Sequence, residues 1–459
     1  MKSVDTIIHA TSPGLRSRLS AWAHRADGRL AHAQAGAVAC HGRIEQVSAT
    51  LIVATLPRCA VGHLCEIPAA CRDTLPILAE VIGFEADRAL LAPLGSTDGI
   101  APQSSIRTLG VPHRINVGPH LLGQVVDGFG RPMRAASAPA NGSALRDVLA
   151  SGPCPIDRPV DHERMVTGVR AIDALLTLAK GQRVGLFAGP GCGKTTLIGA
   201  LARGIAADAI VFALVGERGR ELNAFLEREV DPPIARRTVT VCATSDATPM
   251  ERTRAAFTAT AIAEGLCDGG KHVLLLVDSL TRLARAQREI GLASNEPPGR
   301  FGYPPSVFAM LPRLIERAGR RRTGTITGIY TVLTESDHAD PIADEARSLL
   351  DAHIVLSRKR SERGQYPAID VTASLSRLMH DVVSPAHRTD AERARSLIAR
   401  HADLEWLISL GEYEPGHDAS ADDAVARHPR LLDLLLQDTR TPSPWEKTLE
   451  YLHAAVRGA

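Results

Sequence analysis

The stretch RVGLFAGPGCGKTT, residues 183–196, decides the fold class of this chain. Its first six residues are mostly apolar and predict a buried strand, and the segment TLIGALARGIAA that continues from Thr196 has helical spacing. Between the two, Gly189, Gly191 and Gly193 let backbone amides and a helix N-terminus approach a phosphate closely. A strand, a glycine-rich turn and a helix in this order predict a phosphate-binding loop.

The side chains at the end of this loop suit a nucleotide. The pattern predicts that Lys194 binds the β- and γ-phosphates of ATP and that the Thr195 hydroxyl binds Mg²⁺, with Cys192 and Thr196 as further nucleotide-binding residues of the loop. Ala188 stands where the strict pattern has Gly, early in the loop and away from the amides nearest the phosphates. The alternative, a glycine-rich turn with a chance Lys, is disfavoured by the flanking strand and helix.

Two acidic side chains follow other buried strands of the same region. VLLLVDS contains Asp278, which is suited to hold a water of a Mg²⁺ shell, although many buried strands end in Asp simply as a turn former. VGERGRE offers Glu217 at the end of the strand that follows the phosphate loop, where a carboxylate can orient the water that attacks ATP. Spacing alone leaves a solvated charge cluster equally possible, because Arg218, Arg220 and Glu221 adjoin Glu217.

Residues 183–357 alternate strand-like and helix-like segments. The apolar runs are continuous, as expected for strands of a mainly parallel sheet that is covered on both faces, so the order predicts an α/β core. The expected strands are Arg183–Ala188, Ala209–Gly216, Arg237–Thr244, His272–Ser279, Thr325–Leu333 and His353–Ser357.

The two ends of the chain have different patterns from this core. Residues 38–100 contain short apolar runs broken by Gly and Pro, such as RIEQVSATLIVATL and RALLAPL, which predict a small all-β domain. Beyond about Pro385, apolar residues recur at helical spacing and predict a small helical domain. We therefore expect domains at residues 1–100, 101–384 and 385–459.

Composition argues against several classes of protein. The 53 basic and 51 acidic side chains leave a formal charge of +2, without the basic excess of a protein that coats nucleic acid. No segment has the apolar length needed to cross a bilayer, and the N-terminus lacks the apolar run of a signal peptide. We expect a cytoplasmic protein that meets membranes only through partners.

Cysteine and histidine spacing predicts no metal site made by the protein alone. The eight Cys are scattered, without a CxxC pair or a zinc-type cluster, and indicate reduced thiols. Cys192 gives one additional hypothesis, because the helix N-terminus and Lys194 should favour its thiolate. Alkylation would then inactivate the protein, and Mg-ATP would protect it.

Several longer segments resemble the ATPases of bacterial type III protein export, which power flagellar assembly and injectisomes and are related to the catalytic subunits of rotary ATP synthases. Besides the loop, the resemblance rests on the following segments: TGVRAIDALL (167–176), DSLTRLARAQREI (278–290), GYPPSVFAMLPRLIERAG (302–319), ADPIADEARSLLDAHIVLSR (339–358), QYPAIDV (365–371) and LISLGEYEPGHD (407–418). It implies a RecA-like P-loop core with a mainly parallel sheet, a small N-terminal β-barrel domain and a C-terminal helical domain.

The resemblance also implies roles for individual residues. Glu217 corresponds to the catalytic Glu, which supports hydrolysis over a structural role, and Arg218 corresponds to the residue beside it. Arg282 matches a γ-phosphate contact, and Tyr366 matches the aromatic residue that packs on adenine. Arg377 matches the arginine finger given to the neighbouring subunit's site, which is worth about 10³ to 10⁵ in rate.

The family further implies an assembly and its partners. We expect a homohexamer that hydrolyses Mg-ATP, with loop 294–306 facing the ring axis. Implied partners are a central-stalk protein, a stator or regulator protein, components of the export gate and sorting platform, and chaperone–substrate complexes, but no nucleic acid. The ring would lie at the cytoplasmic face of the inner membrane, and the divergent N-terminal segment favours an injectisome over a flagellum.

Two other classes remain open from the sequence. A hexameric RNA translocase of the transcription-terminator type shares this core but needs an aromatic, basic N-terminal RNA platform. The first hundred residues hold only Trp22, Phe84 and no Tyr, so that platform is poorly supplied. A non-hydrolytic ring subunit is the second alternative, and turnover that is lost in Glu217→Gln would exclude it.

Overall fold

The computed structural model describes residues 40–68, 76–133, 143–334 and 340–457. Trp22 and Cys71 lie outside these ranges. The chain divides into two compact units, Met1–Pro112 and His113–Ala459.

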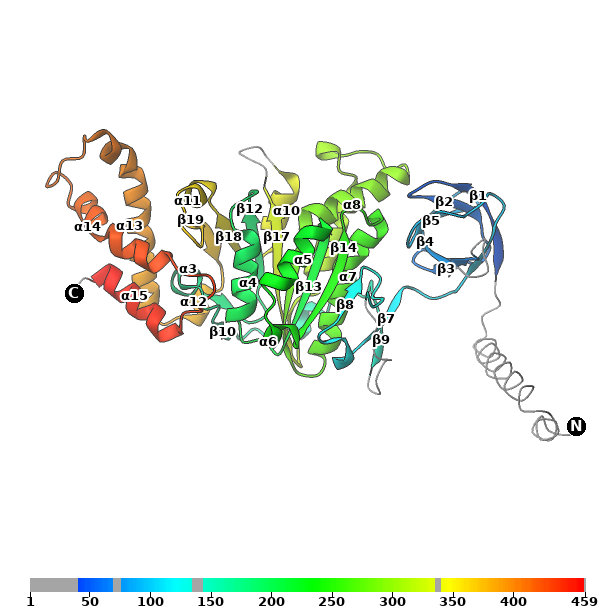
Figure 1. The fold of residues 1–459 in the computed structure, drawn as a ribbon, viewed down its shortest axis with the longest axis horizontal. Helices are drawn as coiled ribbons and strands as arrows, with labels where there is room; N and C mark the ends of the chain where they lie inside the picture. The colour runs from blue at the N-terminus through cyan, green and yellow to red at the C-terminus, as the bar shows by residue number, and fades with distance from the viewer. Residues whose placement is uncertain (1–39, 69–75, 134–142, 335–339, 458–459) are drawn as a thin grey trace, which may run out of the picture. The chain divides into compact units, whose positions relative to one another are not determined.

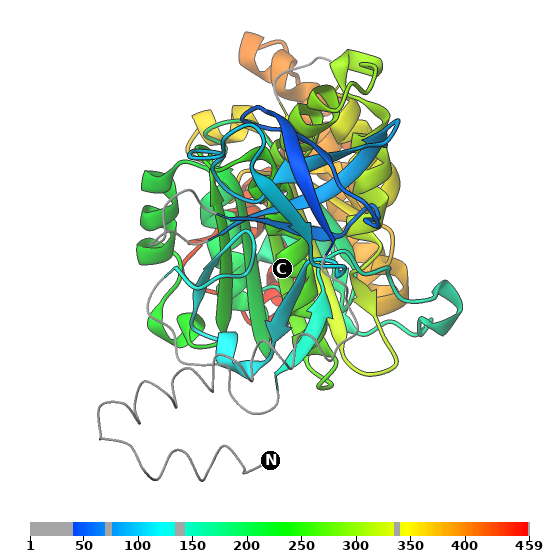
Figure 2. The same cartoon turned by 90° about the vertical axis from the view of Figure 1, so that its right-hand side faces the viewer.

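The described part of the first unit is a closed six-stranded barrel in the order β1-β2-β5-β4-β3-β6 (Figures 1 and 2). Inward-facing side chains such as Ile44, Ile52, Val81 and Ile106 are fully buried and fill its core. The expected small all-β domain is therefore confirmed. The strands are β1 (His41–Val47), β2 (Ile52–Thr55), β3 (Leu64–Ile67), β4 (Ile77–Glu85), β5 (Arg88–Pro93) and β6 (Ser105–Thr108). Because β6 follows residue 100, we propose to extend the first domain through this strand.

The second unit is built on one large, mainly parallel sheet in the order β19-β18-β12-β17-β15-β13-β14-β8, with β16 paired to β17. The six strands expected from the sequence are present with ends within one residue: β12 (Arg183–Ala188), β13 (Ala209–Glu217), β14 (Thr238–Thr244), β15 (His272–Asp278), β17 (Thr325–Leu333) and β18 (Ala352–Leu356). The sequence prediction missed β8 (Val125–Asp127), β16 (Gly319–Arg320) and the antiparallel β19 (Ile369–Ser376). Two short pairs complete the strands: β7 (Arg114–Val117) with β9 (Ala144–Asp147), and β10 (Arg164–Met165) with β11 (Leu178–Ala179).

Both faces of this sheet are buried, which explains the continuous apolar runs. Along β13, Ile210 and Phe212 enter the core on one face, whereas Val211 and Ala213 enter the core on the other. Helices cover both faces (Figure 1). The helices of the core are α3 (Arg170–Leu175), α4 (Lys194–Gly204), α5 (Gly219–Arg228), α6 (Pro232–Ala235), α7 (Pro249–Cys267), α8 (Leu280–Ala293), α9 (Pro305–Ile315), α10 (Pro341–Leu349), α11 (Arg358–Glu362) and α12 (Met379–Val382).

The chain after Pro385 is helical, as its apolar spacing predicted, and these C-terminal helices pack on one another and on α3. They are α13 (Pro385–Leu410), α14 (Ala419–Leu435) and α15 (Trp445–Arg457). The Ser384 hydroxyl caps the first of them by accepting a hydrogen bond from the backbone N–H of His387, and Gly411 ends it in a left-handed conformation.

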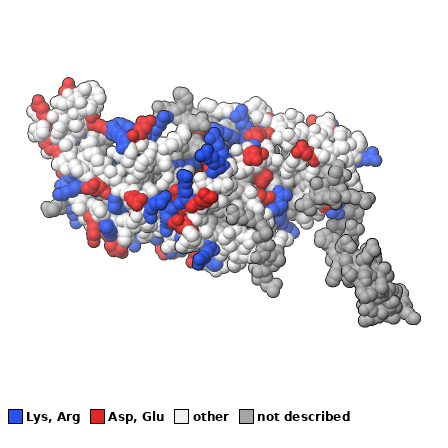
Figure 3. Space-filling view, in the orientation of Figure 1, with Lys and Arg blue, Asp and Glu red and all other residues white. Residues whose placement is uncertain are grey.

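The surface carries both signs of charge. On the face shown in Figure 3, basic and acidic side chains intermingle over the core and the C-terminal helices. None of the helices in the described ranges is both long and apolar enough to cross a bilayer.

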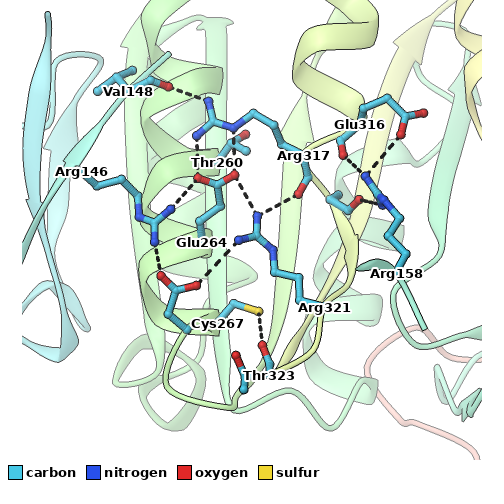
Figure 4. Close-up of polar contacts among 12 residues, drawn as sticks. Arg146, Val148, Arg158, Thr260, Glu264, Cys267, Glu316, Arg317, Arg321 and Thr323 are labelled. Carbon is cyan, nitrogen blue, oxygen red and sulfur yellow. Dashed lines mark hydrogen bonds and ion pairs between the residues drawn. The ribbon is translucent and has the colours of Figure 1, made fainter. Parts of the chain in front are cut away.

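One cluster of charges surrounds Glu264 of α7 (Figure 4), with Glu264 and Arg317 buried and Arg146 and Arg321 partly exposed. Arg317, which has no exposed surface, donates to Glu264 Oε1 and Oε2 at 3.0 and 2.8 Å and to the Val148 carbonyl at 2.6 Å. Arg321 and Arg146 also donate to the Glu264 carboxylate, at 2.9 and 3.2 Å. We call Arg146, Glu264, Arg317 and Arg321 the Glu264 cluster. Burial by itself would raise the pKa of Glu264, but the three arginines together hold it below its usual value.

Candidate nucleotide site

The glycine-rich loop joins the carboxyl end of β12 to the first turn of α4. Gly191 and Gly193 adopt φ values of 78° and 81°, in the left-handed region where L side chains are strained. A Cβ on Gly193 would also lie 3.3 Å from a ring carbon of Tyr366. Both positions therefore favour glycine for their conformation, and Gly193 also leaves room for the Tyr366 ring.

Four charged side chains meet beside this loop, and we call them the phosphate-site cluster: Lys194, Glu217, Asp278 and Arg282. Lys194 Nζ lies 2.5 Å from Asp278 Oδ1 and 3.5 Å from Glu217 Oε1. Arg282 Nη1 lies 2.5 Å from Glu217 Oε2 and donates to the Gly216 carbonyl at 2.9 Å. The structure thus brings together the lysine, both carboxylates and one of the arginines that the sequence singled out.

Parallel pairing explains why these side chains converge. β15 lies between β13 and β17, and Leu214 of β13 pairs with Asp278 at the end of β15. The carboxyl ends of these strands share one edge of the sheet with the loop after β12. The Ser279 hydroxyl caps α8 by accepting a hydrogen bond from the Arg282 backbone N–H. This bond fixes the backbone position from which the Arg282 side chain extends.

The surroundings of Asp278 include a residue that sequence reasoning missed. The Thr331 hydroxyl, near the end of β17, donates to Asp278 Oδ1 at 2.7 Å, and Asp278 as a whole is only 6% exposed. Its other oxygen makes no hydrogen bond to the described residues and is available to a metal-bound water. Its place near the end of a buried parallel strand is the sequence signal that could have pointed to Thr331.

The oxygen atoms present fit a magnesium ion. Thr195, Glu217 and Asp278 line one cavity of about 300 Å³, and hydroxyl and carboxylate oxygens are the ligands Mg²⁺ prefers. In the described part of the chain, no three His, Cys, Asp or Glu side chains are grouped to hold a metal by themselves. A nucleotide's phosphates would therefore supply part of the coordination, as is usual for Mg²⁺.

A second cavity of about 290 Å³ lies on the other side of the loop, lined by Gly193, Thr196 and Tyr366. The Tyr366 ring is 42% exposed, so a face remains open to a flat ligand. The Tyr366 hydroxyl lies 2.9 Å from Ser361 Oγ. The Ser361 hydroxyl donates to the Gly191 carbonyl at 3.1 Å. Ser361, which the sequence did not single out, thus links the aromatic ring to the phosphate loop.

Two of the expected arginines lie apart from the phosphate-site cluster. Arg218 is the N-cap residue of α5. Its side chain is 81% exposed and forms an ion pair with Glu221 at 3.5 Å. Arg377 follows β19, whose end pairs with the start of β18 and, through it, the start of β12. The exposed Arg377 is therefore at the amino edge of the sheet, about 16 Å of strand from its own loop.

The buried position of Cys192 weighs against the alkylation hypothesis. The thiol is 1% exposed and belongs to the apolar core beneath the loop. Lys194, which was expected to favour the thiolate, instead contacts the two carboxylates. An alkylating reagent could reach the Cys192 thiol only if the loop moved away from the core beneath it.

A phosphate loop with a lysine, a strand-end Asp and a second carboxylate on the adjacent strand defines a P-loop ATPase. Three family models agree with this class. Residues 44–110 match the beta-barrel domain of the ATP synthase alpha/beta family, and residues 168–376 match its nucleotide-binding domain. Residues 383–454 match the T3SS EscN ATPase C-terminal domain.

Curated relatives are similar over nearly the whole chain. The type 3 secretion system ATPase of Pseudomonas savastanoi pv. phaseolicola is 50% identical over 444 residues, which cover 95% of this chain and 98% of that protein. The flagellum-specific ATP synthase of Bacillus subtilis is 43% identical over 413 residues, covering 90% and 94%. The assembled ATPase EscN in complex with its central stalk EscO, from enteropathogenic E. coli, has a TM-score of 0.83 and 44% identity, covering 90% of this chain and 100% of that one.

The chain therefore belongs to the type III secretion and flagellar export ATPase family, and it is an ATP-hydrolysing enzyme of type III protein export. This membership decides against the RNA-translocating alternative.

Proposed function

We propose that the chain acts as a homohexameric Mg-ATPase in which each nucleotide site is shared by adjacent subunits. The observation that supports this division is the position of Arg377, exposed and at the sheet edge opposite its own phosphate loop. Such a residue cannot complete the site of its own chain but is free to complete that of a neighbour. It would act as the arginine finger and contribute about 10³ to 10⁵ in rate.

Within one subunit, the phosphate-site cluster divides the remaining work. Lys194 exchanges its carboxylate partners for the β- and γ-phosphates, and Arg282 contacts the γ-phosphate. Thr195 and Asp278 hold Mg²⁺, which neutralises charge on the phosphates when bound. Glu217 orients the attacking water, because its carboxylate lines the same cavity as Thr195 and Asp278 and is freed to accept from water once Lys194 and Arg282 turn to the phosphates.

The base is assigned to the second cavity. Tyr366 would stack on adenine while the backbone amides of Gly191 to Thr196 bind the phosphates, since Pro190 has no N–H to donate. Arg218 is kept as a catalytic candidate only through the family resemblance, since its side chain faces solvent in the isolated chain.

The export partners are inferred from the relatives. The relative EscN is described in complex with its central stalk EscO, which supports a stalk partner and an assembled ring for this chain. Loop 294–306 would face that stalk, and Phe301 in it is 59% exposed. A stator, export-gate and sorting-platform components, and chaperone–substrate complexes would hold the ring at the cytoplasmic face of the inner membrane. The higher identity to a secretion ATPase than to a flagellar one favours an injectisome.

A mixed assembly tests the shared site. Lys194→Ala and Arg377→Ala chains should each be nearly inactive, whereas random 1:1 mixing should leave about one interface in four intact and restore turnover. Glu217→Gln mixed with Arg377→Ala is the matched control and should recover in the same way. Both variants co-assembling without any recovery would contradict the proposal. Loss of turnover in Glu217→Gln alone separates a hydrolytic ring from a nucleotide-binding structural one.

A further inference from the structure

The base cavity is partly built by the segment that joins α14 to α15. Gln437, Asp438 and Thr439 line the cavity of about 290 Å³ together with Tyr366. This segment is about 70 residues from Tyr366 in sequence and belongs to the C-terminal helices. A ligand in the cavity would therefore touch the core and the C-terminal helices at once.

Gln437 bonds three separate parts of the chain. Its backbone N–H donates to the Tyr366 carbonyl at 3.0 Å, at the base of the exposed ring. Its side-chain Oε1 accepts from the Arg170 N–H at 2.8 Å, and its Nε2 donates to the carbonyls of Gly168 and Thr441 at 2.7 and 2.9 Å. Every strong hydrogen-bonding position of this amide is used except one lone pair.

Arginines strengthen the same junction from both sides. The Arg170 guanidinium donates to the carbonyls of Leu434, Asp433 and Leu436, which satisfies the C-terminal end of α14. It also lies 4.4 Å from the ring centre of Tyr451 in α15. From α4, the helix that follows the phosphate loop, Arg203 donates to the Thr439 carbonyl at 3.4 Å.

We propose that Gln437 is a positioning residue that holds Tyr366 at the base cavity and couples nucleotide binding to α14 and α15. The proposal rests on the assignment of Tyr366 to the base. Gln437 fixes the segment 437–441 in one position relative to Gly168 and Arg170, and its backbone bond passes that position to Tyr366. An adenine nucleotide that closes the cavity then stabilises the junction of the C-terminal helices as well.

Substitution with an isostere separates bonding from packing. In Gln437→Glu, the second carboxylate oxygen replaces an N–H₂ donor and faces the carbonyls of Gly168 and Thr441 without a proton. We expect this variant and Gln437→Leu to bind MgADP about tenfold more weakly than the wild type. Mg-pyrophosphate, which lacks a base, should bind all three proteins equally.

The measurements are calorimetric titration of the full-length proteins with MgADP and with Mg-pyrophosphate. Arg440→Ala is the matched control, because its exposed side chain lies in the same segment and makes none of these bonds. In turnover, KM for ATP should rise in Gln437→Glu with kcat little changed, which a general loss of folding would not produce.

Hydrogen exchange tests the coupling itself. MgADP should slow amide exchange in residues 434–443 of the wild type and of Arg440→Ala, but not of Gln437→Glu. Equal MgADP affinity in Gln437→Glu and wild type, or exchange there that ignores MgADP, would overturn the coupling. A wild type that binds Mg-pyrophosphate and MgADP equally would overturn the base assignment, and one without turnover would overturn the proposed function.

Discussion

The second unit contains two clusters in which basic and acidic side chains pair. They differ in whether the basic side chains lie in the core or beside an open cavity. In the Glu264 cluster, the fully buried Arg317 spends its donors on a carboxylate and a backbone carbonyl, both from the same chain. In the phosphate-site cluster, Lys194 and Arg282 contact carboxylates that line an open cavity beside the phosphate loop. Arg317 and Glu264 satisfy each other without a ligand, whereas the second cluster holds its cations where phosphate can replace their partners.

This difference teaches how similar side chains serve stability or chemistry. A buried charge that is fully hydrogen-bonded is costly to disturb, because removal of one member leaves another charge in a low-dielectric core. A charge beside a cavity can change partners, because the ligand brings its own charge and hydrogen-bond acceptors. Substitutions in the two clusters should therefore affect different quantities.

The largest expected effect concerns turnover. If Arg377 acts on another subunit's transferring phosphoryl group as proposed, Arg377→Ala should lower kcat by about 10³ to 10⁵ while MgADP affinity changes little. Steady-state ATPase assays and calorimetric titration measure the two quantities. Arg388→Ala, an exposed arginine of α13, is the control. A kcat within tenfold of wild type would remove Arg377 from the site.

The next effect concerns stability. Arg317→Met should lower the free energy of unfolding of the second unit by about 3 to 5 kcal/mol, since Glu264 loses its bidentate partner in the core. Urea denaturation followed by circular dichroism measures this change. A loss below 1 kcal/mol, with the other arginines still in place, would show that they compensate for Arg317.

The Glu264 cluster also predicts a pH dependence. The folded protein holds the pKa of Glu264 below its usual value, so its charged form adds stability that is present above the unfolded pKa of about 4.3 and is lost as pH falls through the folded pKa. The difference in unfolding free energy between wild type and Glu264→Gln should be constant above about pH 5.5 and shrink in more acidic solution. A difference that instead grows on acidification would contradict the sign.

The smallest effect is expected at an exposed ion pair near the same region. Arg322 pairs with Asp157, but its side chain is 78% exposed. Arg322→Met should change the unfolding free energy by less than about 1 kcal/mol, and 0.5 M salt should remove most of the change. A loss as large as that of Arg317→Met would mean that burial does not set the cost.

The sequence predicted what depends on periodicity and on short motifs. The six core strands, the glycine loop, and the convergence of Lys194, Glu217 and Asp278 all follow from buried parallel strands that end at one edge. It did not predict β8, because a three-residue strand carries no period. The burial of Cys192 was missed because spacing does not show which way a loop side chain points.

Other parts of the site depend on bonds between distant segments. Ser361 and Thr331 are common polar residues whose value lies in one hydrogen bond each, to Gly191 and to Asp278. Gln437 gains its position from the packing of the C-terminal helices on α3. Apart from the strand-end position of Thr331, no local pattern marks such residues, since tertiary structure brings their partners near. The roles of Arg218, Arg282, Tyr366 and Arg377 came from family resemblance and stay predictions.

The two ends of strand β12 lie next to different functional candidates. Its final residue leads into the phosphate loop. Its first residues pair with the start of β18, which in turn pairs with the end of β19, just before the exposed Arg377. If Arg377 completes a neighbour's site as proposed, the donating and receiving surfaces of a subunit differ, and subunits would associate head to tail rather than about a twofold axis. ATP turnover per subunit would then rise steeply with protein concentration until the ring of subunits is complete.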